Sequence, residues 1–138
     1  MKTFFDSSAF AKRYIEDQNS PDIDKYCLNA TSLAVSIICI PEIISALARL
    51  KRDSKITSSQ FKQGKQALFT DLSDAIICIL NQTVIQKTIH ALENCQLRAM
   101  DAIHIACALE WQSDLFITSD HKQYDAAKKL GIKALLIQ

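Results

Sequence analysis

Residues 3–9 read Thr-Phe-Phe-Asp-Ser-Ser-Ala, a short apolar run that ends at an acid and leads into small residues suited to a helix. Four later runs are also short, continuous and apolar, which is typical of strands buried on both faces of a parallel sheet. The pattern therefore favours an α/β fold. The five predicted strands are Thr3–Phe5, Leu33–Ile38, Ala75–Leu80, Leu115–Thr118 and Ala134–Ile137.

Helical patterns separate these runs along the whole chain. Gly131 follows two lysines and a leucine, as expected just after a helix ends, and Pro41 suits the first position of a helix. The alternation of strand and helix predicts a doubly wound domain of three layers, α/β/α, with a central parallel sheet of about five strands covered on both faces. The predicted helices are Ser8–Glu16, Ile23–Asn29, Glu42–Arg52, Ser58–Ser73, Thr83–Asn94, Met100–Trp111 and Lys122–Leu130.

Length and composition are those of one globular domain over residues 1–138, with 49% hydrophobic and 22% charged residues. The only two glycines, Gly64 and Gly131, form no glycine-rich phosphate-binding loop. Five cysteines without a C-x-x-C pair predict reduced thiols rather than disulfides or a zinc site. Asp6 interrupts any signal peptide, and no apolar stretch reaches the roughly 20 residues of a membrane span. We therefore expect a soluble, cytoplasmic protein without a membrane partner.

Four acids lie where predicted strands end and the next helices begin: Asp6, Glu42, Asp101 and Asp120. In open α/β sheets, ligands bind at this edge. Each acid alone has a simpler explanation, because carboxylates are favoured in the first turn of a helix. If the four converge, however, their repulsion raises their pKa values unless a cation neutralises them. An all-oxygen set without paired His or Cys ligands fits Mg²⁺ or Mn²⁺.

Four motifs, in this order and at these separations, resemble the PIN domain family, and most closely its VapC-type toxin ribonucleases. The resemblance covers the whole chain, and it depends on the motifs jointly because none is specific alone. The motifs are Phe-Asp-Ser-Ser-Ala at 5–9, Pro-Glu-Ile-Ile-Ser-Ala-Leu at 41–47, Met-Asp-Ala-Ile-His-Ile-Ala at 100–106 and Phe-Ile-Thr-Ser-Asp at 116–120.

The resemblance implies an endoribonuclease that depends on Mg²⁺ or Mn²⁺ and hydrolyses RNA phosphodiester bonds with metal-activated water. Carried over by position, Asp6, Asp101 and Asp120 would be metal ligands, directly or through water. Glu42 would be a further ligand or would orient the attacking water. The small hydroxyl residues Ser7, Ser8 and Thr118 would support the four catalytic acids.

The resemblance also implies partners: the toxin of a type II toxin–antitoxin pair has a cognate antitoxin, and many such toxins form homodimers. The apolar face of the helix from Ser58 and the face of Ile44, Leu47 and Ala48 could form a groove for a partner helix. Simple packing of these two faces on each other is the favoured interpretation.

Without the four site acids, 11 acidic residues remain against 16 Lys and Arg, so positive charge is available for phosphate contacts. Arg98 and Lys122 are the best candidates for RNA binding by their proximity to the acids. Aromatic residues make up only 7%, so we expect recognition through RNA shape and backbone. His104 lies one turn after Asp101 on the same helical face, but a structural role is favoured because the metal mechanism needs no imidazole.

Two alternatives keep the fold: a PIN nuclease of RNA processing or DNA repair without an antitoxin, and a non-catalytic RNA-binding module. The presence of all four acids argues against the second. Two other classes with related architecture are excluded by residues after the first strand. A response-regulator receiver needs an acidic pair there and a haloacid-dehalogenase-like phosphatase needs Asp-x-Asp, whereas Ser7 and Ser8 follow Asp6.

Overall fold

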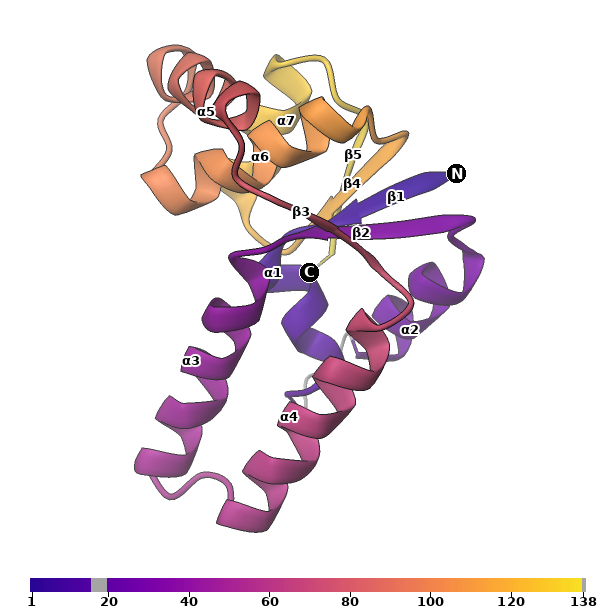
Figure 1. Cartoon of the computed structure of the whole chain (residues 1–138), viewed down its shortest axis with the longest axis vertical. Helices are drawn as coiled ribbons and strands as arrows, with labels where there is room; N and C mark the ends of the chain where they lie inside the picture. Colours follow the sequence, from indigo (N-terminus) through magenta and orange to yellow (C-terminus); the bar gives the residue numbers. More distant parts are fainter. Residues whose placement is uncertain (16–19, 138) are drawn as a thin grey trace.

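Five parallel strands form one sheet in the order β3-β2-β1-β4-β5, so the first strand of the chain lies at its centre (Figure 1). The structure is a computed structural model and describes residues 1–15 and 20–137. The strands are β1 (Lys2–Phe5), β2 (Ser32–Ser36), β3 (Ile76–Cys78), β4 (Leu115–Thr118) and β5 (Ala134–Leu136). The helices are α1 (Ser7–Phe10), the 3₁₀ helix η1 (Ala11–Arg13), α2 (Ser20–Asn29), α3 (Cys39–Arg52), α4 (Ser58–Leu72), α5 (Gln82–Asn94), α6 (Ala99–Trp111) and α7 (His121–Lys129).

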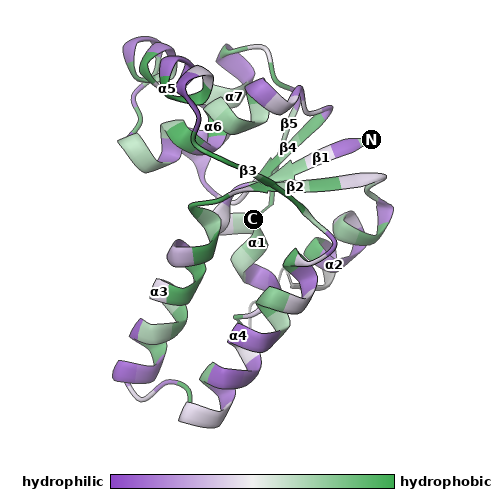
Figure 2. Cartoon of the chain, viewed as in Figure 1, coloured by the Kyte–Doolittle hydropathy of each residue, from purple (hydrophilic) through white to green (hydrophobic). Residues whose placement is uncertain are grey.

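The helices form a layer on each face of the sheet. Helices α1 to α4 lie on one face, and α5, α6 and α7 lie on the other (Figure 1). Each layer has its own core because successive strand residues point to opposite faces: Phe5 packs in the first core and Phe4 in the second. The strands are mainly hydrophobic, and the ends of α3 and α4 far from the sheet are mainly hydrophilic (Figure 2). The predicted α/β/α architecture is confirmed.

The carboxyl ends of β1, β2 and β4 meet at one edge of the sheet. Phe5 pairs with Val35 of β2 and with Ile117 of β4. The N–H of Asp6 then donates to the carbonyl of Ile117 at 3.1 Å, which extends the pairing by one residue. The segments that follow these strands therefore begin side by side, although they come from distant parts of the sequence.

Several predicted boundaries are wrong. Strands β2 and β3 end two residues early, because the apolar residues that follow belong to the turn before α3 and to the exposed segment before α5. Helix α3 begins at Cys39, so Pro41 is its third residue rather than its first; the first helical turn tolerates proline because its N–H groups have no intrahelical partner. The first predicted helix is broken into α1 and η1, and its last residue, Glu16, lies outside the described residues.

Other predictions from the sequence are confirmed. Gly131 follows α7 with φ +85°, a left-handed conformation that glycine adopts without steric cost. All five cysteines are free, and two of them, Cys39 and Cys107, are buried. Across the described part of the chain, no helix combines the length and apolar character needed to cross a membrane.

Candidate active site

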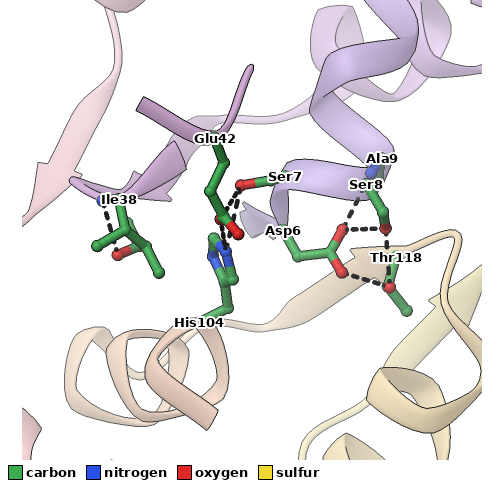
Figure 3. Close-up of polar contacts among 9 residues, drawn as sticks. Asp6, Ser7, Ser8, Ala9, Ile38, Glu42, His104 and Thr118 are labelled. Atoms are coloured by element: carbon green, nitrogen blue, oxygen red, sulfur yellow. Dashed lines mark hydrogen bonds and ion pairs between the residues drawn. The ribbon is translucent and has the colours of Figure 1, made fainter. Parts of the chain in front are cut away.

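Asp6 lies at the centre of the sheet edge and is held by three donors. It follows β1 as the N-cap of α1, where its Oδ1 accepts from the N–H of Ala9 at 3.0 Å and from the hydroxyl of Ser8 at 2.7 Å. Its Oδ2 accepts from the hydroxyl of Thr118, at the end of β4 (Figure 3). The side chain is only 2% exposed. Burial raises the pKa of Asp6, although His104 and these hydrogen bonds act in the opposite direction.

Glu42 belongs to a second cluster beside Asp6 (Figure 3). It lies in the first turn of α3, and its Oε1 is 2.6 Å from the Ser7 hydroxyl, which donates to it, and 2.6 Å from Nε2 of His104. The Glu42 side chain is 29% exposed, whereas that of His104 is 2% exposed. Burial opposes the ionised form, but the hydrogen bonds from His104 and Ser7 outweigh it and lower the pKa of Glu42.

Asp101 and Asp120 line an open cavity of about 920 Å³ at the same edge. Asp101 lies in the first turn of α6; Asp120 is the N-cap of α7 and accepts from the N–H of Lys122 at 2.8 Å. Partial burial and then the negative charge of Asp120 raise the pKa of Asp101, and Glu42 adds to the effect. The residues around the cavity are Ser8, Gln96, Leu97, Arg98, Asp101, Ser119, Asp120, His121 and Lys122.

The four predicted acids therefore share one edge, but they are not arranged as a closed metal cage. Within residues 1–15 and 20–137, no three His, Cys, Asp or Glu side chains are grouped closely enough to hold one ion. Protein donors occupy oxygens of Asp6, Glu42 and Asp120. The chemistry of the donor set still fits a hard cation, because it offers carboxylate oxygens and because His104 and Arg98 only partly offset the effect of Asp120 and Glu42 on the pKa of Asp101.

The supporting residues predicted from the sequence contact the acids. The Ser7 hydroxyl donates a hydrogen bond to Glu42, and the hydroxyls of Ser8 and Thr118 donate hydrogen bonds to Asp6. Arg98 and Lys122, the predicted RNA-binding residues, both line the cavity with Asp101 and Asp120. The sequence favours a structural role for His104, and in the structure this residue contacts Glu42 directly. Its spacing from Asp101 placed it on the correct helical face, but spacing alone gave no sign that α3 brings Glu42 against it.

Residues 3–129 match the family model of the PIN domain. The chain belongs to the PIN domain family. The match includes all four acids, and the predicted resemblance is confirmed. A search of curated protein sequences finds no significant match for this PIN domain.

Solved structures with the same fold include VapC20 of Mycobacterium tuberculosis, described as a sarcin-ricin loop cleaving toxin. It has a TM-score of 0.71 and 11% identity, over 98% of this chain and 99% of that chain. VapBC2 from Rickettsia felis, bound to a DNA fragment from its promoter, has a TM-score of 0.69 and 13% sequence identity, over 100% of both chains. A toxin-antitoxin complex from Klebsiella pneumoniae has a TM-score of 0.67 and 16% sequence identity, over 88% of this chain and 89% of that chain. At these identities the likeness establishes the fold of this PIN domain.

Proposed function

We propose that this PIN domain is a divalent-metal-dependent endoribonuclease, acting as a single domain over residues 1–138, and that it is the toxin of a type II toxin–antitoxin pair. The observation that carries the proposal is the joint placement of four carboxylates at the sheet edge, two of them in a cavity with Arg98 and Lys122. The neighbouring structures support it, because one is described as a sarcin-ricin loop cleaving toxin and others as toxin–antitoxin assemblies.

Asp6, Asp101 and Asp120 are the residues that would hold Mg²⁺ or Mn²⁺, with Glu42 as a further ligand or as the group that orients water. When bound, such an ion supplies Lewis-acid chemistry: it acidifies water and offsets the negative charge that builds on the phosphate. Ser8 and Thr118 keep the Asp6 carboxylate in place. Arg98 and Lys122 supply positive charge at the cavity for the phosphates of the RNA.

Incubation of the protein with total RNA, with and without Mg²⁺ or Mn²⁺, tests the proposal. Wild type should cleave only with metal, and Asp101→Asn should lower cleavage at least about 100-fold, since it removes a carboxylate from the site. Asp74→Asn is the matched control, because this exposed acid precedes β3 at the opposite edge of the sheet. Equal cleavage with wild type and Asp101→Asn would mean that the site acids do not catalyse it, and would favour the non-catalytic RNA-binding module.

Hydrolysis by activated water predicts the chemistry of the ends. The attacking oxygen stays on the phosphate and the 3′ oxygen leaves, so the products should carry 5′-phosphate and 3′-hydroxyl groups. End-labelling of the cleaved RNA measures this directly. Products with 2′,3′-cyclic phosphate ends refute the mechanism.

A groove between α3 and α4 supports the proposed antitoxin. A cavity of about 490 Å³ there is lined by apolar residues together with Lys55 and with Arg13, whose guanidinium already pairs with Asp24 and Asp71, and it suits the apolar face of an amphipathic helix. Residues on its wall include Tyr14, Leu47, Leu50, Ile56, Arg13 and Lys55. Isolation of the protein from its native cells should bring down a small partner. Its absence would favour a PIN nuclease of RNA processing or DNA repair without an antitoxin.

The proposed homodimer has a candidate surface on α5. Ile85, Ile89 and Leu92 are all exposed, and their spacing places them along one face of the helix. Sedimentation of the purified protein should give a dimer, and Ile89→Glu should shift it towards the monomer. An unchanged oligomeric state would exclude this face as the interface.

A further inference from the structure

His104 is a buried polar residue in the middle of α6, among apolar residues of the core. Helix α6 contributes Ala102, Ile105, Ala106 and other apolar residues to the interior, and His104 is 2% exposed among them. Its Nδ1 atom is buried and has no hydrogen-bond partner among the residues that the structure describes. An unpaired polar atom in the interior opposes stability, so packing alone does not explain a histidine here.

The other ring nitrogen, Nε2, makes two contacts that settle its role as a donor. It lies 2.6 Å from Oε1 of Glu42 and 3.2 Å from the Oγ of Ser7. The ionised carboxylate of Glu42 can only accept, and the single hydroxyl proton of Ser7 is already donated to Glu42. The proton must therefore be on Nε2, shared between Glu42 and Ser7.

These contacts use one oxygen of Glu42 and leave the other available. Oε1 receives both donors, whereas Oε2 makes no hydrogen bond to any residue in the described ranges. The two donors come from different elements, Ser7 from α1 and His104 from α6, so together they restrict the rotation of a side chain that belongs to α3. A carboxylate held in this way can present a single oxygen in a defined direction.

We propose that His104 is a positioning residue of the nuclease: with Ser7 it holds Oε1 of Glu42, so that Oε2 is the oxygen offered to the attacking water or a cation. The inference rests on the proposed function, and it assigns His104 a role through Glu42 rather than a proton transfer of its own. Replacement of His104 by an apolar residue then lowers kcat without a matching loss of stability.

Steady-state cleavage of one RNA by His104→Leu and His104→Gln tests the inference. His104→Leu should lower kcat by about 10–100-fold with KM within about twofold, because it removes a group that orients a reacting residue. His104→Gln should restore kcat to within about threefold of wild type, since the glutamine amide nitrogen can replace the Nε2 donor. The melting temperature of His104→Leu should stay within about 3 °C of wild type.

A double-mutant cycle shows whether His104 acts through Glu42. In a Glu42→Ala background, His104→Leu should change kcat by less than about twofold, because the residue to be positioned is gone. Additive losses overturn the inference, and so does a His104→Gln protein as impaired as His104→Leu. Wild-type kcat in His104→Leu beside an impaired Glu42→Ala also overturns it, while leaving the proposed nuclease function intact.

The ¹⁵N shifts of the His104 ring decide the inference independently of activity. A proton on Nε2, with a resonance altered by Ser7→Ala and Glu42→Ala, is the expected signature. A ring protonated on Nδ1 alone overturns the inference whether or not the wild type cleaves RNA. A wild type that never cleaves RNA, with the expected ring signature, refutes the proposed function and leaves His104 as the group that holds Glu42.

Discussion

The hydroxyl of Thr118 donates to Oδ2 of Asp6, a hydrogen bond between residues 112 positions apart in the sequence. The same Oγ1 accepts from the N–H of Asp120 at 3.0 Å. One threonine at the end of β4 thus holds the carboxylate that follows β1 and also the backbone of the acid that caps α7.

Thr118→Val should destabilise the protein, because it keeps the side-chain shape but removes both hydrogen bonds at a fully buried position. We expect the melting temperature to fall by about 4–12 °C, the range for a loss of ~1–3 kcal/mol in a domain of this size. Calorimetry measures the change, and Thr118→Ser, which retains the hydroxyl, is the control. A valine variant as stable as the serine variant would contradict the role of the hydroxyl.

Asp6→Asn should raise stability at neutral pH. Because the folded state raises the pKa of Asp6, ionisation of this buried acid is less favourable in the folded than in the unfolded chain. Ionised Asp6 therefore lowers the free energy of unfolding of the wild type at a pH above its folded-state pKa. This loss of stability disappears as the pH falls below the pKa of Asp6 in the unfolded chain. We expect the melting temperature of Asp6→Asn at pH 7 to exceed that of wild type. Melting curves from pH 4 to pH 8 should show the gain shrinking with acidity.

The exposed acid Asp74 provides the comparison for this variant. Asp74→Asn changes the net charge equally but should leave the melting temperature nearly unchanged at every pH. A lower melting temperature of Asp6→Asn at pH 7 would show that its ionised hydrogen bonds outweigh the effect of burial.

Millimolar Mn²⁺ should raise the melting temperature of wild type, since a ligand that binds only the folded state stabilises it, by about 2.7 kcal/mol at 100 times Kd. Asp101→Asn should lose most of this shift, because it removes one of the negative charges that now repel each other. Differential scanning fluorimetry across a metal titration measures both proteins. Equal shifts in the two would place the ion elsewhere.

Arg98→Ala and Lys122→Ala should weaken RNA binding and reduce its dependence on salt. Each removes one cation from the wall of the cavity, so the slope of log K against log salt should fall by about 0.7–0.9 per residue. Binding by fluorescence anisotropy to catalytically inactive protein gives the slope. Slopes equal to that of the parent protein would mean that neither side chain contacts phosphate.

Gly131→Ala should destabilise the protein by ~1 kcal/mol, or about 4 °C, without affecting RNA cleavage. Its φ is +85°, and a Cβ there would meet nothing within 4 Å, so the effect comes from the backbone conformation alone. Gly64→Ala is a useful contrast, because its Cβ would approach Leu47 at 3.4 Å without an unusual φ. If Gly131→Ala has the same melting temperature as wild type, the left-handed conformation of residue 131 is not maintained in solution.

The layers and the strand positions could be predicted from the sequence because continuous apolar runs and helical periodicity are local signals. The ends of the strands could not be predicted, since Ile38 and Cys39 stay buried after the chain has left the sheet. A run of apolar residues looks the same in a buried strand and in the buried turn that follows it. The break between α1 and η1 also had no local signal.

The shared edge of Asp6, Glu42, Asp101 and Asp120 followed from the rule that parallel strands end together. The partners of each carboxylate did not follow, because they depend on side-chain rotation across elements far apart in sequence. The sequence predicts converging carboxylates, whereas in the structure the Asp6 carboxylate accepts from Ser8 and Thr118 and the described residues hold no group of three metal ligands. No pattern in the sequence indicates the contact between Glu42 and His104.

The central position of β1 has a consequence during synthesis. The strand made first can gain its neighbour on one side only when β4, residues Leu115–Thr118, has left the ribosome. Until then Asp6 has neither Thr118 nor Asp120 beside it. The acidic edge of the sheet therefore cannot be complete in a nascent chain until residues 115–120 have emerged.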